Sequence, residues 1–143
     1  MTSSRGLSNE RRKLRILIDT HFVIALADDR IEESSPRHRG VILDRSSEVF
    51  ISAASLWEME IKSRIGKLPL RKPITEWPGI LERAGAQILP IELKHIFSSI
   101  GPEIRTRDPF DRLLLGVCAA DDMRLVTMDR DMVNHPLAWR PFP

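Results

Sequence analysis

The chain has 143 residues, of which 42% are hydrophobic, and this length fits one domain with a buried core. Its single cysteine excludes an internal disulfide framework, and its net charge of +2 is too small to identify a nucleic-acid-binding protein by itself. The charged N-terminus has no apolar stretch typical of a signal peptide, and no apolar run approaches the ~20 residues of a membrane-spanning helix, so we expect a cytoplasmic protein without a membrane partner.

Short apolar runs typical of buried strands alternate along the chain with segments of helical periodicity. Residues 1–13 are polar and basic and are expected to form a flexible tail, and residues 14–143 are expected to form a single domain. The expected strands cover residues 14–18, 49–51, 87–89 and 125–127, and the expected helices cover residues 22–26, 34–45, 53–65, 74–84, 93–99 and 109–120. This alternation predicts an α/β fold with a mainly parallel central sheet of four to five strands and helices on both faces.

Four acidic residues, scattered over more than a hundred positions, follow expected strands or begin the helices beside them: Asp19, Glu58, Asp111 and Asp129. In open parallel sheets, ligands bind beyond the carboxyl ends of the strands, so these side chains can converge. Converging carboxylates repel one another and need a cation. Their hard oxygen atoms favour Mg²⁺ or Mn²⁺, and the chain has no closely spaced His/Cys pair for a zinc site.

Asp19 and Asp129 also have an ordinary structural explanation. Asp19 ends an apolar strand and could simply cap the next helix, a role open also to Thr20. Asp129 lies in a loop with Asp131, where isolated aspartates commonly form turns. Their positions at the carboxyl ends of strands favour the metal site. Thr20, Asp131 and Thr127, whose hydroxyl could reach the site, are secondary candidates.

Glu58 lies in a helix that we expect to begin at Ser52. A capping box is the alternative, in which Ser55 caps the helix and Glu58 reaches back to a backbone N–H. In the Ser52 register, Glu58 shares a face with isoleucines three and seven positions later, and a carboxylate on such an inward face needs a partner. Glu60 falls beside Arg64, where a surface ion pair accounts for it.

Asp108 and Asp111 lie on either side of Pro109 at the start of an expected helix. Capping and the helix dipole could account for both acids, and capping is the favoured role of Asp108, which stays a secondary candidate. Asp111 is the better metal ligand, because the positive end of the helix stabilises its ionised form. Arg107 and Arg112 flank these acids and are candidates for contact with a phosphate group.

The order of four motifs is more specific than any single acid. They are Ile-Leu-Ile-Asp-Thr at 16–20, Ile-Ser-Ala-Ala-Ser-Leu-Trp-Glu at 51–58, Arg-Asp-Pro-Phe-Asp-Arg-Leu-Leu at 107–114 and Leu-Val-Thr-Met-Asp at 125–129. Over residues 14–131 the chain resembles a PIN domain of the toxin type called VapC. The resemblance implies a PIN-like three-layer sandwich and an endoribonuclease that depends on Mg²⁺ or Mn²⁺. It also implies a homodimer that is silenced by an antitoxin protein.

By position, the resemblance assigns the catalytic metal site to the four acids Asp19, Glu58, Asp111 and Asp129. A helix that reads W-E-x-x-x-K and is followed by G-K-L, here from Trp57 through Lys62 to residues 66–68, resembles one subgroup of these toxins. One departure is His21, which stands where Ser or Asn is common. The departure leaves Asp19 in place and affects only its immediate surroundings.

Other classes of protein also place an acidic residue after the first strand of a parallel sheet. A haloacid-dehalogenase-like phosphatase needs a second Asp two residues after the first, where this chain has His21, and a receiver-like domain needs a lysine after the last strand, where it has Arg130. A noncatalytic PIN-like module that binds RNA or protein is the open alternative. Aromatic residues could stack on RNA bases, although packing in the core is their expected role: Trp57, Trp77, Phe97 and Phe110. His21 and His95 are expected to be ordinary helical residues.

Overall fold

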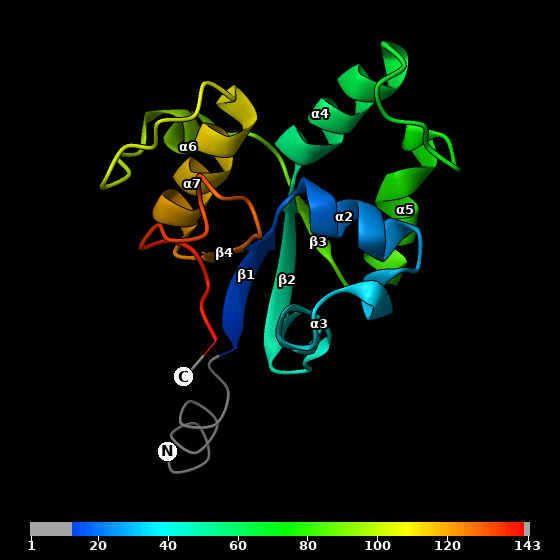
Figure 1. Cartoon of the computed structure of the whole chain (residues 1–143), viewed down its shortest axis with the longest axis horizontal. Coiled ribbons are helices and arrows are strands. Elements are labelled where there is room, and N and C mark those ends of the chain that lie inside the picture. The colour runs from blue at the N-terminus through cyan, green and yellow to red at the C-terminus, as the bar shows by residue number, and fades with distance from the viewer. Residues whose placement is uncertain (1–12, 142–143) are drawn as a thin grey trace, which may run out of the picture.

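The structure, a computed structural model, describes residues 13–141 (Figure 1). Four strands form its central sheet: β1 (Leu14–Ile18), β2 (Ser47–Ser52), β3 (Gln87–Leu89) and β4 (Arg124–Val126). They lie in the order β3-β2-β1-β4, and every neighbouring pair is parallel. The predicted parallel α/β sheet is therefore confirmed. Residues 1–12 of the expected tail lie outside the described residues, so the tail stays a prediction.

Helices cover both faces of this sheet (Figure 1). They are α2 (Thr20–Ala27), α3 (Pro36–Leu43), α4 (Ala53–Arg64), α5 (Trp77–Arg83), α6 (Leu93–Phe97) and α7 (Pro109–Asp121), with 3-10 turns η1 (Ile31–Glu33) and η2 (Ile74–Glu76). The single helix expected over 74–84 is divided into η2 and α5, and Pro78 lies in the first turn of α5, where its missing N–H is tolerated. No helix in residues 13–141 combines the length and the apolar character needed to cross a membrane.

Alternate residues of β1 point to opposite layers, as the period of a strand requires. Ile16 and Ile18 pack in the core that includes Trp77 and residues of α2, α3 and α5, whereas Leu17 packs in the core that includes Leu115 and other residues of α7. All five of these side chains are buried. Burial on both faces explains why residues 16–18 of β1 are a continuous apolar run rather than an alternating one.

Helices α6 and α7 approach each other closely at Gly116. A Cβ atom added there would overlap the backbone carbonyl oxygen of His95. His95 is fully buried: its Nδ1 accepts the backbone N–H of Glu92 (3.1 Å), and its Nε2 lies 2.8 Å from Asp121 Oδ2. Lys94 Nζ lies 2.7 Å from the other Asp121 oxygen. His95 is therefore a bridge between the two helices rather than an ordinary helical residue.

The strand order creates a switch point between β1 and β4. From β1 the chain proceeds through β2 to β3 on one side, and it returns to add β4 on the other side. In open α/β sheets the crevice at such a point, outside the carboxyl ends of the strands, is where ligands bind. Asp19 directly follows β1, and Asp129 comes three residues after the end of β4. The topology thus directs two of the predicted acids to one crevice.

Candidate metal centre

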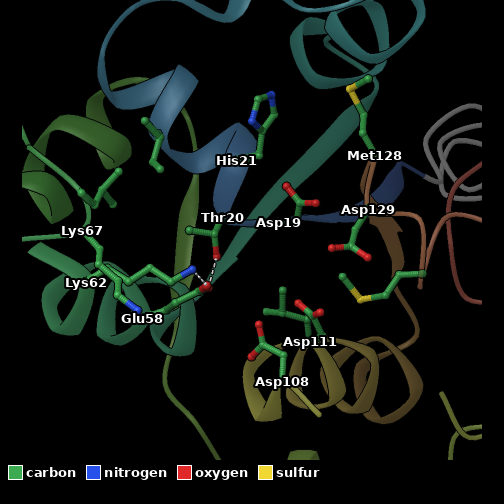
Figure 2. Close-up of a pocket in the computed structure, with 14 residues that line it drawn as sticks. Asp19, Thr20, His21, Glu58, Lys62, Lys67, Asp108, Asp111, Met128 and Asp129 are labelled. Carbon is green, nitrogen blue, oxygen red and sulfur yellow. Dashed lines mark hydrogen bonds and ion pairs between the residues drawn. The ribbon is translucent and has the colours of Figure 1, made fainter. Parts of the chain in front are cut away.

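An open cavity of about 630 Å³ lies at this crevice (Figure 2). Its lining includes five acids from four separate segments of the chain: Asp19, Glu58, Asp108, Asp111 and Asp129. Figure 2 shows the carboxylates of Asp19, Asp111 and Asp129 turned toward the same space, with Glu58 on the other side of the cavity. The structure therefore brings together all four acids proposed from the sequence, and it adds Asp108.

Asp19 is both a helix cap and a cavity residue. Its Oδ1 accepts the backbone N–H of Phe22 (3.3 Å), and its side chain is buried at 7% exposure. Burial raises the pKa of Asp19 above its ordinary value, although hydrogen bonds from the Thr127 hydroxyl and from Phe22 oppose the shift. The two explanations considered for Asp19 are thus compatible, because one carboxylate can cap a helix and also face the cavity.

Asp111 has the largest pKa shift of the cavity acids. Burial, together with the charges of the four other cavity acids, raises its pKa to about 7. The neighbours that contribute are, in decreasing order, Asp108, Asp129, Glu58 and Asp19. A carboxyl group whose charge is disfavoured by other negative charges is stabilised when a cation binds.

Asp129 and Thr127 form a hydrogen-bonded turn after β4. The Asp129 backbone N–H donates to Thr127 Oγ1 (3.0 Å), and Asp129 Oδ1 accepts the backbone N–H of Asp131 (2.8 Å). Thr127 is buried and does not line the cavity, and Asp131 is exposed and also lies outside the lining. Thr127 therefore connects Asp19 to Asp129, because its hydroxyl donates to the Asp19 carboxylate and accepts the Asp129 backbone N–H. Asp131 closes the turn.

Glu58 is held by two partners. Its Oε1 accepts the Thr20 hydroxyl (2.6 Å), and its Oε2 lies 2.6 Å from Lys62 Nζ.

The Ser52 hydroxyl accepts the backbone N–H of Ala54 (3.0 Å), so α4 begins where predicted and the alternative capping box is wrong. Ile65 is 59% exposed, so the inward face of α4 ends before this residue, contrary to our expectation.

Asp108 caps α7, as predicted, and also lines the cavity. Its Oδ1 accepts the backbone N–H of Phe110 (2.9 Å). Arg107 is exposed and Arg112 is partly buried, and neither lines the cavity. The Arg112 guanidinium instead pairs with Glu103 and donates to the Ser98 carbonyl oxygen (2.7 Å). The two arginines are thus not brought to the acids, and a phosphate contact by either stays a prediction.

A sequence profile of the PIN domain matches residues 16–136, which include β2, β3, β4, residues 16–18 of β1 and all five cavity acids. The chain belongs to the PIN-domain family. The resemblance seen in the four ordered motifs is therefore confirmed at the family level, and the fold class agrees with it.

Two comparisons place this PIN domain among relatives. It is 34% identical over 71 residues to Ribonuclease VapC16 of Mycobacterium tuberculosis (strain ATCC 25618 / H37Rv), a match that covers 49% of the chain and 48% of that relative. The chain thus spans about half the length of the curated relative. In the crystal structure of VapBC2 from Rickettsia felis bound to a DNA fragment from their promoter, one chain has the same fold, with a TM-score of 0.53 at 15% identity over 87% of this chain and 96% of that chain.

The donor set of the PIN-domain cavity fits a hard divalent cation, since it consists of carboxylate oxygens that disfavour one another's charge. Within residues 13–141, three ligand atoms within 4.8 Å of one another occur instead at Glu92, His95 and Asp121. There Lys94 already supplies a positive charge, and both nitrogens of His95 are bonded. The cavity is therefore the better candidate for a metal site, because the charged form of Asp111 is disfavoured there by burial and by the other acids.

The cavity of this PIN domain also has a basic side. Lys62, Lys67 and His21 line it together with the acids. The contact between Lys62 and Glu58 is predictable from the sequence, because residues four apart on a helix are neighbours and Lys62 follows Glu58 at that spacing. Lys67 belongs to the G-K-L motif, and its position depends on the turn at Gly66, which has a φ of 77°.

The aromatic side chains separate into buried and exposed ones. Trp77 is 1% exposed, as expected of a core residue, but Trp57 is 55% exposed and Phe97 is 77% exposed, so core packing was a wrong expectation for these two. Trp57 contacts Phe110 edge to face, with ring centroids 5.3 Å apart. This pair of an exposed Trp57 and a half-buried Phe110 joins α4 to the start of α7, next in sequence to Glu58 and Asp111.

Proposed function

We propose that this PIN domain is a metal-dependent endoribonuclease that acts as the toxin of a toxin–antitoxin pair. The observation that carries the proposal is the convergence of five carboxylates on one cavity, where burial, together with the charges of the other four acids, raises the pKa of Asp111 to about 7. The similarity to Ribonuclease VapC16 supports RNA as the substrate. The proposed reaction is hydrolysis of a phosphodiester bond by water.

A bound Mg²⁺ or Mn²⁺ would lower the pKa of water to give a nucleophile at neutral pH and would compensate the charge that develops on the phosphate. Asp19 and Asp111 are the proposed principal ligands, and Asp129 would bind directly or through water. Glu58 would orient the attacking water. Thr20 holds Glu58 in place for that task. The carboxylates of this chain would thus bind the cation, and Thr20 would hold Glu58 in the orientation that positions the water.

The direct test is digestion of total RNA by the purified protein with Mg²⁺, with Mn²⁺ or with EDTA, beside the Asp19→Asn variant. Asn also caps helices, so the variant is expected to fold, and removal of one ligand charge is expected to lower cleavage at least about a hundredfold. Asp29→Asn is the matched control. It makes the same charge change just beyond the other end of α2, at a residue with φ of 55°, a conformation that Asn tolerates.

Metal-dependent cleavage that is lost only in Asp19→Asn would support the proposal. Cleavage that survives EDTA, or that persists in Asp19→Asn, would contradict it. A protein that neither cuts RNA nor binds metal in calorimetry would instead favour the noncatalytic PIN-like module.

We further propose an antitoxin protein and a second copy of this chain as partners. The similarity of the fold to a chain of VapBC2 supports the first. An exposed apolar face on α6 supports the second: Leu93, Ile96 and Phe97 are 70%, 50% and 77% exposed and follow the i, i+3, i+4 spacing of one helix face. Light scattering is expected to show a dimer of the 16.4 kDa chain that Phe97→Asp converts to a monomer.

Leu43→Asp is the control for this dimer test, since Leu43 is 49% exposed on α3, away from α6. A monomeric wild-type protein would contradict the dimer. A dimer that Phe97→Asp leaves intact would contradict the assignment of the interface to α6.

A further inference from the structure

The Glu58 carboxylate is the best-satisfied acid in the cavity. Each of its oxygens has a close partner, the Thr20 hydroxyl on Oε1 and the Lys62 ammonium on Oε2, both at 2.6 Å (Figure 2). The Glu58 side chain is 8% exposed, whereas that of Lys62 is 46% exposed. The ammonium group therefore meets Glu58 at the border between the protein interior and the open cavity.

In the part of the chain that the structure describes, the other four cavity acids have no ion-pair partner. Among residues 13–141, the ion pairs within 4.0 Å involve neither Asp19 nor Asp108, Asp111 or Asp129. Instead, Asp19 and Asp108 accept backbone N–H groups at helix starts, and Asp129 accepts one within its own turn. The positive charge in the cavity is thus unevenly placed: the Lys62 ammonium is bonded to Glu58 and acts on Asp108 and Asp111 only through space (Figure 2).

We propose that Lys62 is a built-in counter-cation that occupies the place of a second divalent ion, so that the site binds one ion, on the side of Asp19, Asp111 and Asp129. The inference rests on the proposed function, which supplies the need for a metal. Two-metal sites hold their ions ~3.5–4 Å apart and need carboxylates free to serve both. An ammonium group already bonded to Glu58 repels a second dication there and removes the negative charge that would attract it.

Titration calorimetry of the metal-free protein with Mn²⁺, in the absence of RNA, tests this stoichiometry. We expect one Mn²⁺ per chain for the wild-type protein and two for Lys62→Met, because the neutral side chain leaves the Glu58 carboxylate uncompensated. Lys62→Arg keeps the charge and is expected to bind one ion. Electron paramagnetic resonance of the doubly loaded variant is expected to show spin coupling between neighbouring Mn²⁺ ions, which the wild-type protein lacks.

Arg64→Met is the matched control. Arg64 pairs with Glu60 at the same i, i+4 spacing on the same helix, with N and O atoms 3.1 Å apart, but both side chains are exposed and neither lines the cavity. The control therefore removes one positive charge and one helical ion pair without touching Glu58, and it is expected to bind one ion. Circular dichroism establishes that each variant is folded.

Two ions bound by the wild-type protein, or one ion bound by a folded Lys62→Met variant, would overturn the role of Lys62 while leaving the metal-dependent nuclease intact. A second ion in Arg64→Met would also overturn it, because the effect would then follow net charge alone. A wild-type protein that binds no Mn²⁺ would overturn the metal requirement itself, so the two failures are distinguishable.

Discussion

Asp111→Asn is expected to lower RNA cleavage at least about a hundredfold and, in the absence of metal, to raise the stability of the protein at pH 8. The first effect follows from the loss of a charged ligand from the proposed metal site. The second follows because the neutral amide removes a charge that four other acids and partial burial disfavour. A residue that served the fold alone would show the opposite pattern, with activity and stability falling together.

The sign of the stability effect follows from the pKa of Asp111, which rises from an ordinary value of 3.8 to about 7 in the folded protein. Between pH 4 and pH 7 the folded state binds this proton more tightly than the unfolded state, so the free energy of unfolding falls as the pH rises through that range. Above pH 7 the penalty of the charged group is complete. Asn lacks this titration, so the stability difference between the variant and the wild-type protein should vanish near pH 4.

Thermal unfolding in EDTA at pH 4 and at pH 8 measures this difference. Because Asp111 is partly exposed, we discount the full shift for solvent screening and expect about 1 kcal/mol at pH 8, or a few degrees in Tm. Asp122→Asn is the control: it makes the same charge change at the other end of α7, at an exposed residue with φ of 54°, which Asn tolerates. An Asp111→Asn variant that cuts RNA normally would refute the assignment of this residue.

Gly116→Ala is expected to destabilise the protein by about 3 kcal/mol, near the upper end for overpacked cores, and to lower its Tm by about 10 °C. In an open helix the same change stabilises, because alanine loses less conformational entropy than glycine. Here the new Cβ would overlap the backbone carbonyl oxygen of His95, and a backbone atom cannot rotate away. Helix α6 would have to move, and the 2.8 Å contact between His95 and Asp121 would lengthen.

Gly40→Ala is the matched control for this prediction. Gly40 also lies inside a helix, α3, but nothing lies within 4 Å of the position of its Cβ. We expect this variant to be as stable as the wild-type protein or up to about 1 kcal/mol more stable. Circular dichroism melting curves of the two variants separate the cost of the helix contact from the general effect of alanine. A Gly116→Ala variant with an unchanged Tm would contradict the close approach of α6 and α7.

The elements of this fold could be predicted because their signals are local. Period and turn residues located all four strands, and the caps at Ser52 and Asp108 were identified from the residues themselves. Boundaries were less accurate where a tertiary contact decides them. Residue Thr127, expected inside the last strand, follows β4, and its hydroxyl bonds the Asp129 backbone instead of serving as a packed strand residue.

The candidate site was predictable for a different reason. In a parallel sheet the carboxyl ends of the strands share one edge, so acids that follow strands converge whatever the intervening sequence contains. That rule anticipated Asp19 and Asp129, and the helix starts beside the same edge brought in Glu58 and Asp111. The parallel sheet, the PIN family and the convergence of the four acids on one cavity were thus determined by the sequence itself.

Only the tertiary structure decided which partners these side chains have. Thr20 and Glu58 are 38 residues apart and His95 and Asp121 are 26 apart, so their contacts depend on how helices pack and not on local propensity. The same packing turns Arg112 away from the acids. Local rules specify where a chain bends and which face is apolar, whereas charge compensation depends on distances of a few ångströms between distant segments, and these exist only once the helices are packed.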